Sequence, residues 1–134
     1  MAFQSEKYAA DKFESGVWRE IDGGRFRIAK AGNSVYEEAL EANAYRKAKT
    51  PKAREKALYT AVAIGILKDW EEVIDAKGTT IPYSVVAAVK VLAENPDLVT
   101  KILEEANDLS NFRREDIKEQ ADAAVGFTPG SENG

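Results

Sequence analysis

The stretch ILKDWEEVIDAKGTTIPYS, residues 66–84, holds the sharpest change of pattern in the chain. Its first half continues an apolar run and predicts the end of a helix. Gly78 is typical of a helix end, and Pro82 favours an extended conformation for the residue before it. Ser84 is a favourable N-cap for another helix. The stretch therefore predicts a corner between two helices, with Ile81 and Tyr83 holding the extended step against the core.

The helix before this corner is predicted to run from about residue 51 to about residue 75. Thr50 suits its N-cap, and Pro51 suits its first position. Gly65 lowers helix propensity by up to about 1 kcal/mol relative to alanine, so we expect another helix to approach closely there. Apolar residues occupy nearly its whole circumference, as in a helix central to a fold or an oligomer. They are Leu58, Ala61, Val62, Ile64, Ile66, Leu67, Trp70, Val73 and Ile74.

Capping signals predict the remaining helices. The positions that open them are Asn33 or Ser34, Ser84, Asn95 followed by Pro96, and Ser110 or Asn111. A capping box is predicted from the spacing of Ser34 and Glu37, and such a cap contributes on the order of 1 kcal/mol. The helix after Pro96 is predicted to turn inward the residues Leu98, Ile102, Leu103 and Ala106. The last predicted helix, FRREDIKEQADAAV, is highly charged.

Alternating apolar and polar residues mark residues 17–29, on either side of an Asp-Gly-Gly turn that predicts a β-hairpin. An isolated hairpin is only marginally stable, so we expect this one to pack on helices or on another chain. The predicted fold class is mainly α: a small helical domain of about five helices with an N-terminal β-hairpin. The domain is expected over residues 16–125, after a flexible or short helical segment (1–15) and before a flexible tail (126–134).

Composition excludes several classes of site. The 134 residues include no cysteine and no histidine, which excludes disulfides, zinc–thiolate sites and Ser-His or Cys-His catalysis. A net charge of −4 argues against nucleic acid as the main partner, because phosphate binding usually needs a basic patch. The first residues lack the apolar region of a signal peptide, and the apolar run at residues 57–67 is too short to span a membrane. We expect a soluble, single-domain protein without metal or cofactor.

Two groups of charged residues carry weaker signals. The carboxylates Asp69, Glu72 and Asp75 are spaced to share one side of the predicted helix. Calcium binding or acid–base work is conceivable there, but a solvated face is the more common role. A basic run at residues 46–56 is also more often solvated surface than a nucleic acid site.

Three segments occur in a recognisable order: VWREIDGGRFRIAKAGNSVYEEAL (17–40), LKDWEEVIDAKGTTIPYS (67–84) and ENPDLVTKILEEAND (94–108). Together they resemble the tail assembly chaperones of long-tailed bacteriophages and prophages. The resemblance covers about residues 16–112 and rests on the order of features, since the family has no catalytic signature. It implies a non-catalytic protein that binds the tape measure protein and recruits tail tube subunits. It also implies action in the host bacterial cytoplasm and absence from the mature virion.

On this hypothesis the corner sets the angle between two helices and shapes an apolar groove or a self-association face. The residues predicted to bind the partner are Trp70, Ile81, Tyr83, Val86, Leu98 and Ile102. We expect a homo-oligomer, because a long partner is best covered by many weakly bound copies. Many such families also make a longer product by translational frameshifting. Two other functions stay open: an adaptor or regulator that binds nucleic acid through residues 46–56, and an enzyme that relies on carboxylates such as Asp69 and Asp75.

Overall fold

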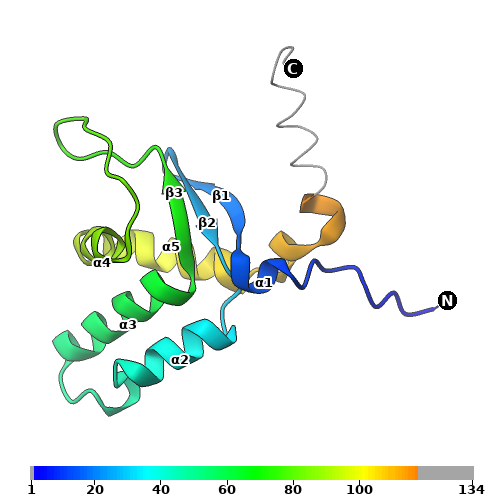
Figure 1. Ribbon diagram of the computed structural model, residues 1–134, viewed down its shortest axis with the longest axis horizontal. Helices are drawn as coiled ribbons and strands as arrows, with labels where there is room; N and C mark the ends of the chain where they lie inside the picture. Colours follow the sequence, from blue (N-terminus) through cyan, green and yellow to red (C-terminus); the bar gives the residue numbers. More distant parts are fainter. Residues whose placement is uncertain (1, 118–134) are drawn as a thin grey trace.

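The computed structural model describes residues 2–117 of the 134 (Figure 1). In chain order the elements are α1 (Lys12–Ser15), β1 (Val17–Ile21), β2 (Gly24–Ile28), α2 (Ser34–Ala42), η1 (Tyr45–Lys47), α3 (Pro51–Gly65), β3 (Leu67–Glu71), α4 (Val85–Glu94), α5 (Pro96–Asn107) and η2 (Leu109–Phe112). The strands form one antiparallel sheet in the order β1-β2-β3. The fold is therefore mixed α/β, and the prediction of a mainly α domain is wrong.

The predicted hairpin is confirmed as β1 and β2. Its turn consists of Asp22 and Gly23, which both have positive φ (51° and 88°). Positive φ at both central residues gives a two-residue hairpin turn whose twist matches the strands that it joins. The pairing of Ile21 with Gly24 closes the hairpin.

The third strand was not predicted from the sequence. The helix predicted to reach about residue 75 ends at Gly65, and β3 follows it directly. In β3, Leu67 pairs with Ile28 and Trp70 with Phe26, because the β2–β3 register shifts between Arg27 and Ile28. This bulge adds one residue, so Leu67 and Trp70 face the core although they are three positions apart. A spacing of three is also the spacing of a helix face, which explains the error.

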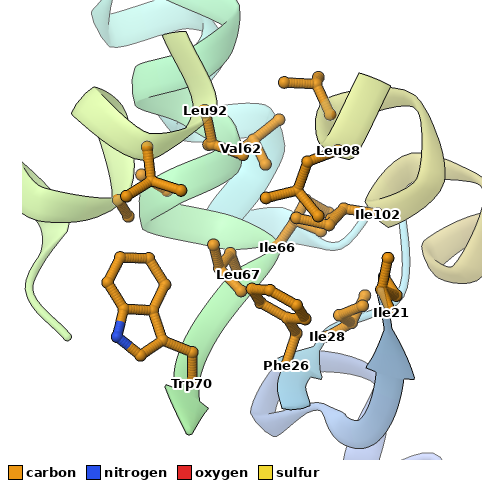
Figure 2. Packing of buried hydrophobic residues seen from close by; sticks show 14 of the residues in the cluster. Ile21, Phe26, Ile28, Val62, Ile66, Leu67, Trp70, Leu92, Leu98 and Ile102 are labelled. Atoms are coloured by element: carbon orange, nitrogen blue, oxygen red, sulfur yellow. The ribbon is translucent and has the colours of Figure 1, made fainter. Parts of the chain in front are cut away.

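The main core lies between one face of the sheet and helices α3, α4 and α5 (Figure 2). Its fully buried members include Ile28 from the sheet, Val62 from α3, Ile66 between α3 and β3, Leu92 from α4 and Ile102 from α5. Each element turns one apolar face inward, and their burial is the main favourable term in folding.

Helices α2 and α3 approach closely at Gly65, as predicted. A Cβ atom at Gly65 would lie 2.6 Å from the Tyr36 backbone nitrogen and closer still to the Tyr36 Cα atom. Asn33 caps α2 by accepting a hydrogen bond from the Tyr36 N–H (3.0 Å), and its side-chain amide also donates to the Gly65 carbonyl (2.9 Å). Asn33 therefore both starts one helix and fastens it to the end of the other.

The N-terminal segment is tied to residues that follow α5. Tyr8 forms an antiparallel bridge with Arg113, and the Ala9 N–H donates to the Phe112 carbonyl (2.8 Å). The Phe112 ring is fully buried and meets the Phe13 ring edge-on, with centroids 5.6 Å apart. Most of the last predicted helix and the predicted tail at residues 126–134 lie outside the described residues.

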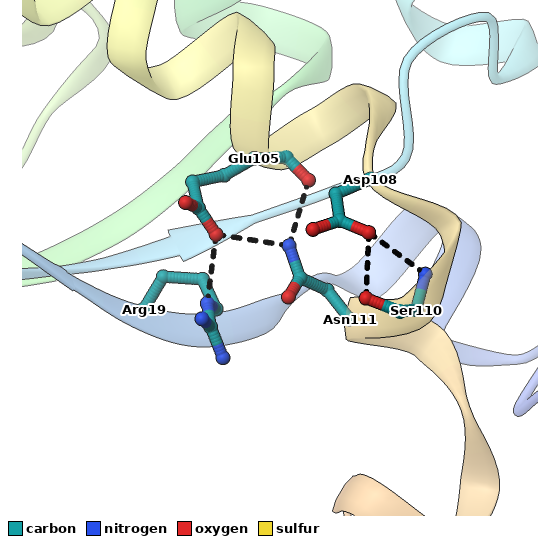
Figure 3. Close-up of polar contacts among 5 residues, drawn as sticks. All are labelled: Arg19, Glu105, Asp108, Ser110 and Asn111. Atoms are coloured by element: carbon teal, nitrogen blue, oxygen red, sulfur yellow. Dashed lines mark hydrogen bonds and ion pairs between the residues drawn. The ribbon is translucent and has the colours of Figure 1, made fainter.

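A polar cluster holds η2 against the sheet (Figure 3). The Arg19 Nε–H of β1 donates to the Glu105 carboxylate (2.9 Å), and the buried Asn111 amide donates to both the Glu105 carboxylate and the Glu105 carbonyl (2.9 Å each). Nearby, Asp108 accepts from the Ser110 N–H and hydroxyl. The buried Asn111 amide finds its hydrogen-bond acceptors on Glu105 of α5, and these bonds fix η2 in position.

Candidate protein-binding surface

The loop at residues 72–83, here called the corner loop, is fastened to β3 by two aromatic residues. The Trp70 indole N–H donates to the Ile81 carbonyl (2.7 Å), and the Trp70 and Tyr83 rings meet edge-on with centroids 5.2 Å apart. The Tyr83 hydroxyl lies within hydrogen-bonding distance of the carbonyls of Leu67 (2.6 Å) and Ala63 (3.1 Å). These contacts fix where α4 begins.

Alkaline pH tests the role of Tyr83. Burial raises the pKa of the Tyr83 hydroxyl above its ordinary value of 10.0; the Asp69 carboxylate raises it further and Arg27 opposes the rise. Because the folded-state pKa is raised, the protonated Tyr83 hydroxyl stabilises the folded state. This stabilisation is fully present below pH 10.0 and is lost as pH rises through the folded-state pKa. We expect Tyr83→Phe to cost about 1 kcal/mol of unfolding free energy at neutral pH. It should also flatten the alkaline loss of stability relative to the unmodified chain.

Urea unfolding across the alkaline range measures both effects. Tyr36 and Tyr59 also have raised pKa values and are present in both proteins, so only the difference between the two curves reports on Tyr83. Parallel curves would mean that the Tyr83 hydroxyl does not hold the corner.

The outward side of α4 carries apolar side chains beside the exposed Lys90. Ala88, Val91 and Leu92 are buried, whereas Val85 is 41% exposed and Val86 is 82% exposed. Val89 is half-buried and Ala93 is exposed, and the spacing of Val86, Val89 and Ala93 places them along one side of the helix. We call Val85, Val86, Val89 and Ala93 the α4 outer face. Figure 1 shows α4 at the edge of the molecule.

Beside α4 lies an open groove of about 540 Å³. It is bounded by the β1–β2 turn, the corner loop and the junction of α4 with α5. Its apolar lining comprises Ile21, Phe26, Val73, Ile74, Ala76, Ile81, Val91 and Leu98. Its carboxylates are Asp22, Glu72, Asp75, Glu94 and Asp97, against the single cation Lys90. We call this the acidic groove.

The six residues predicted to bind a partner occupy different environments. Ile81 and Leu98 line the acidic groove. Trp70 and Ile102 are buried in the core, and Tyr83 is half-buried behind the corner loop. Val86 lies on the exposed outer face of α4.

The three carboxylates do not share a helix face, because β3 and the corner loop replace the predicted helix. Asp69 lies in β3, where its side chain accepts from the Trp70 N–H (2.8 Å). Glu72 follows β3 with a positive φ of 60°. Asp75 accepts from two backbone N–H groups of its own loop (2.9 Å each), and this contact shapes the loop.

The basic segment at residues 46–56 covers the connection between α2 and α3 and the start of α3, at the lower left of Figure 1, whereas the corner loop lies at the upper left. Its cations are exposed. Arg46 forms an ion pair with Glu37 (3.3 Å). The segment is therefore an accessible positive surface.

Of the α4 outer face, sequence reasoning named only Val86, and it missed much of the acidic groove. For α4 a signal was present: residues 85–93 read VVAAVKVLA, with Lys90 as their only charge, so the helix is apolar nearly all round. No sequence signal predicted the groove, because residues such as Asp22 and Asp97 come to line it only in the tertiary fold.

Within residues 2–117, no group of three or more acidic side chains is arranged to hold a metal ion. In the same part of the chain no helix has the length and apolarity needed to cross a membrane.

Comparison with known proteins identifies the family. Residues 26–123 match the family described as YdaY prophage protein, which is more than half of the chain. No curated protein matches, and no solved structure matches. The family match confirms the phage or prophage origin that the sequence resemblance implied. The chain belongs to the YdaY family of prophage proteins.

Proposed function

We propose that this prophage protein is a tail assembly chaperone, which binds the tape measure protein and recruits tail tube subunits. The observation that carries the proposal is the α4 outer face, where Val85 and Val86 are exposed on a helix that is apolar nearly all round. Exposed apolar surface of this kind is typical of a protein-binding site. Membership in a prophage family supports a phage protein as the partner.

The arrangement suits a long helical partner. An apolar helix face binds another amphipathic helix through anchors spaced three and four residues apart. In this proposal Val86 contacts the partner, Ile81 and Tyr83 set the position of α4, and Trp70, Leu98 and Ile102 hold the fold. The protein acts without catalysis or cofactor in the host bacterial cytoplasm and leaves before the virion is complete. Many weakly bound copies along one partner reinforce one another, so the proposal includes self-association.

The test is co-expression of the chain with the tape measure and tail tube proteins of its own prophage, followed by affinity capture with washes of rising salt. We expect the tape measure protein to stay bound at high salt, because salt screens charge contacts but not apolar ones. Loss of both partners from a folded chain would overturn the proposal. The exposed basic segment would then favour the alternative of nucleic acid binding, which salt-dependent binding to non-specific DNA would detect.

The variant Val86→Asp separates binding from stability. Val86 is the second residue of α4, where a carboxylate interacts favourably with the helix dipole, so the free energy of unfolding should change by less than about 0.5 kcal/mol. A charge in the middle of an apolar interface should weaken capture of the tape measure protein about 30-fold. The measurement is affinity capture together with a urea unfolding curve.

Phe3→Asp is the matched control, since Phe3 is similarly exposed (86%) but lies far from α4 in the chain. It should retain the partner. Equal capture by Val86→Asp and the unmodified chain would remove the α4 outer face from the binding site.

A further inference from the structure

The molecule carries opposite charges on two separate surfaces. The acidic groove lies beside the corner loop, and the basic segment lies at the connection between α2 and α3 (Figure 1). We infer that the basic segment of one copy docks in the acidic groove of the next, so that copies join head to tail. This inference extends the self-association included in the proposed function, and it specifies which surfaces meet.

The charges of the groove have few partners within the chain. Among residues 2–117, Asp22 is the only groove carboxylate in an ion pair, which it forms with Lys101 (2.7 Å). Glu94 is the last residue of α4, where the helix dipole is negative and a carboxylate is unfavourable. A cation brought to Glu94 and Asp97 would relieve this repulsion.

The basic segment has the reverse arrangement. Helix α3 has no acidic residue in its first turn, and Lys52 and Arg54 lie there beside the positive end of the helix dipole. Within the described residues neither forms an ion pair, and Lys47, Lys49 and Lys56 are exposed beside them. The positive potential of this end is therefore directed to solvent.

The two surfaces also match in their apolar parts. The apolar lining of the groove includes the exposed Ile74 and the buried Leu98. The basic segment offers Ala48, Pro51 and the aliphatic stems of its lysines, which can cover apolar surface while their charged ends meet carboxylates. The proposed contact therefore combines apolar burial with charge pairing.

Because two different surfaces meet, one from each copy, the contact is heterologous. A heterologous contact leaves one free groove and one free basic segment in every dimer, so copies continue to add. Val85 and Val86 are not part of the groove lining, so they remain available to another protein.

The test is sedimentation of the purified full chain alone, without any phage partner. At salt near 0.1 M, where the Debye length is about 10 Å, the weight-average mass should rise with concentration above the 14.7 kDa of one copy. Near 1 M salt, where the Debye length is about 3 Å, the mass at each concentration should fall toward that of one copy.

Two charge variants test the assigned surfaces. The groove variant is Glu94→Lys, and the basic-segment variant is Lys49→Glu with Lys52→Glu. All three positions are exposed. Two of the changes, at 94 and 52, improve the match with the dipole of their own helix, so each variant should fold. Each variant alone should associate at least about tenfold more weakly than the unmodified chain. Glu104→Lys, an exposed reversal on α5 outside the groove lining, is the matched control and should associate normally.

Mixing the two variants gives the sharpest result. The groove variant keeps its basic segment and the basic-segment variant keeps its groove, so an equimolar mixture should form dimers that neither variant forms alone. Association that survives in both variants, a mixture without dimers, or an unmodified chain that stays monomeric would each overturn the inference. If the chain stays monomeric but still captures the tape measure protein, the proposed function stands and only head-to-tail joining fails.

Discussion

The Trp70→Ala variant is expected to lose about 4 kcal/mol of unfolding free energy, the largest loss that we predict. Trp70 is only 5% exposed and packs in the main core. Its removal leaves a cavity beside Phe26 and also frees the Ile81 carbonyl from its indole donor. Both effects loosen the corner loop, so α4 should become mobile before the rest of the domain unfolds. Urea unfolding measures the loss, and hydrogen exchange at Ile81 reports the local opening.

Trp70→Phe separates the two contributions. It keeps most of the buried area but removes the hydrogen bond to Ile81, so it should cost about 1 kcal/mol for the bond, with a smaller packing term. If Trp70→Ala instead kept full stability and lost only its phage partner, Trp70 would belong to the binding surface, as the sequence first indicated.

Gly65→Ala is expected to lower the free energy of unfolding by about 3 kcal/mol, although alanine is the better helix former. The new methyl group would overlap the backbone of Tyr36, so α2 and α3 must move apart. That movement stretches the hydrogen bond from Asn33 to the Gly65 carbonyl. Thermal unfolding followed by circular dichroism measures the change.

Two further variants show whether crowding is the cause. Truncation of the Tyr36 side chain in the Gly65→Ala background should not restore stability, because the closest atoms belong to the Tyr36 backbone. Gly78→Ala meets open space at a positive φ of 83° and should cost only about 1 kcal/mol from backbone strain. Equal losses at the two glycines would argue against a close helix contact at Gly65.

Local signals predicted the elements whose ends are set by local chemistry. The turn at Asp22 and Gly23 produced the hairpin, and Thr50 and Ser84 cap α3 and α4 through the side-chain hydrogen bonds expected of them. For α2 the choice between Asn33 and Ser34 is settled by tertiary structure, because Asn33 also bonds to Gly65. Turns and N-caps of this kind involve residues no more than four positions apart, so they can be predicted from a single sequence.

The third strand depends on a partner distant in sequence. Residues 67–71 become a strand because β2 offers them an edge, and the bulge opposite Ile28 gives Leu67 and Trp70 a helix-like spacing. Periodicity alone cannot distinguish a bulged strand from a helix turn. The same error placed Asp69, Glu72 and Asp75 on one face.

The candidate surfaces were predictable only in part. Val86 was among the predicted residues and is exposed, but which side of α4 faces outward depends on how α3 and α5 pack against it. Leu98 and Ile102 carry the same apolar signal as Val86, and that signal does not distinguish core from contact surface. The acidic groove combines residues from the hairpin turn, the corner loop and α5, and no local sequence pattern predicts that they lie together.

Ribosomal synthesis delivers the two sides of the N-terminal bridge at very different times. The Arg114 guanidinium donates to the Tyr8 carbonyl across 106 positions of sequence. Until Phe112 has left the ribosome, Phe13 has no aromatic partner and the backbone around Tyr8 has no strand to pair with. Contacts so far apart form late, because a long loop must close first. The domain therefore completes its folding only after translation has passed about residue 114.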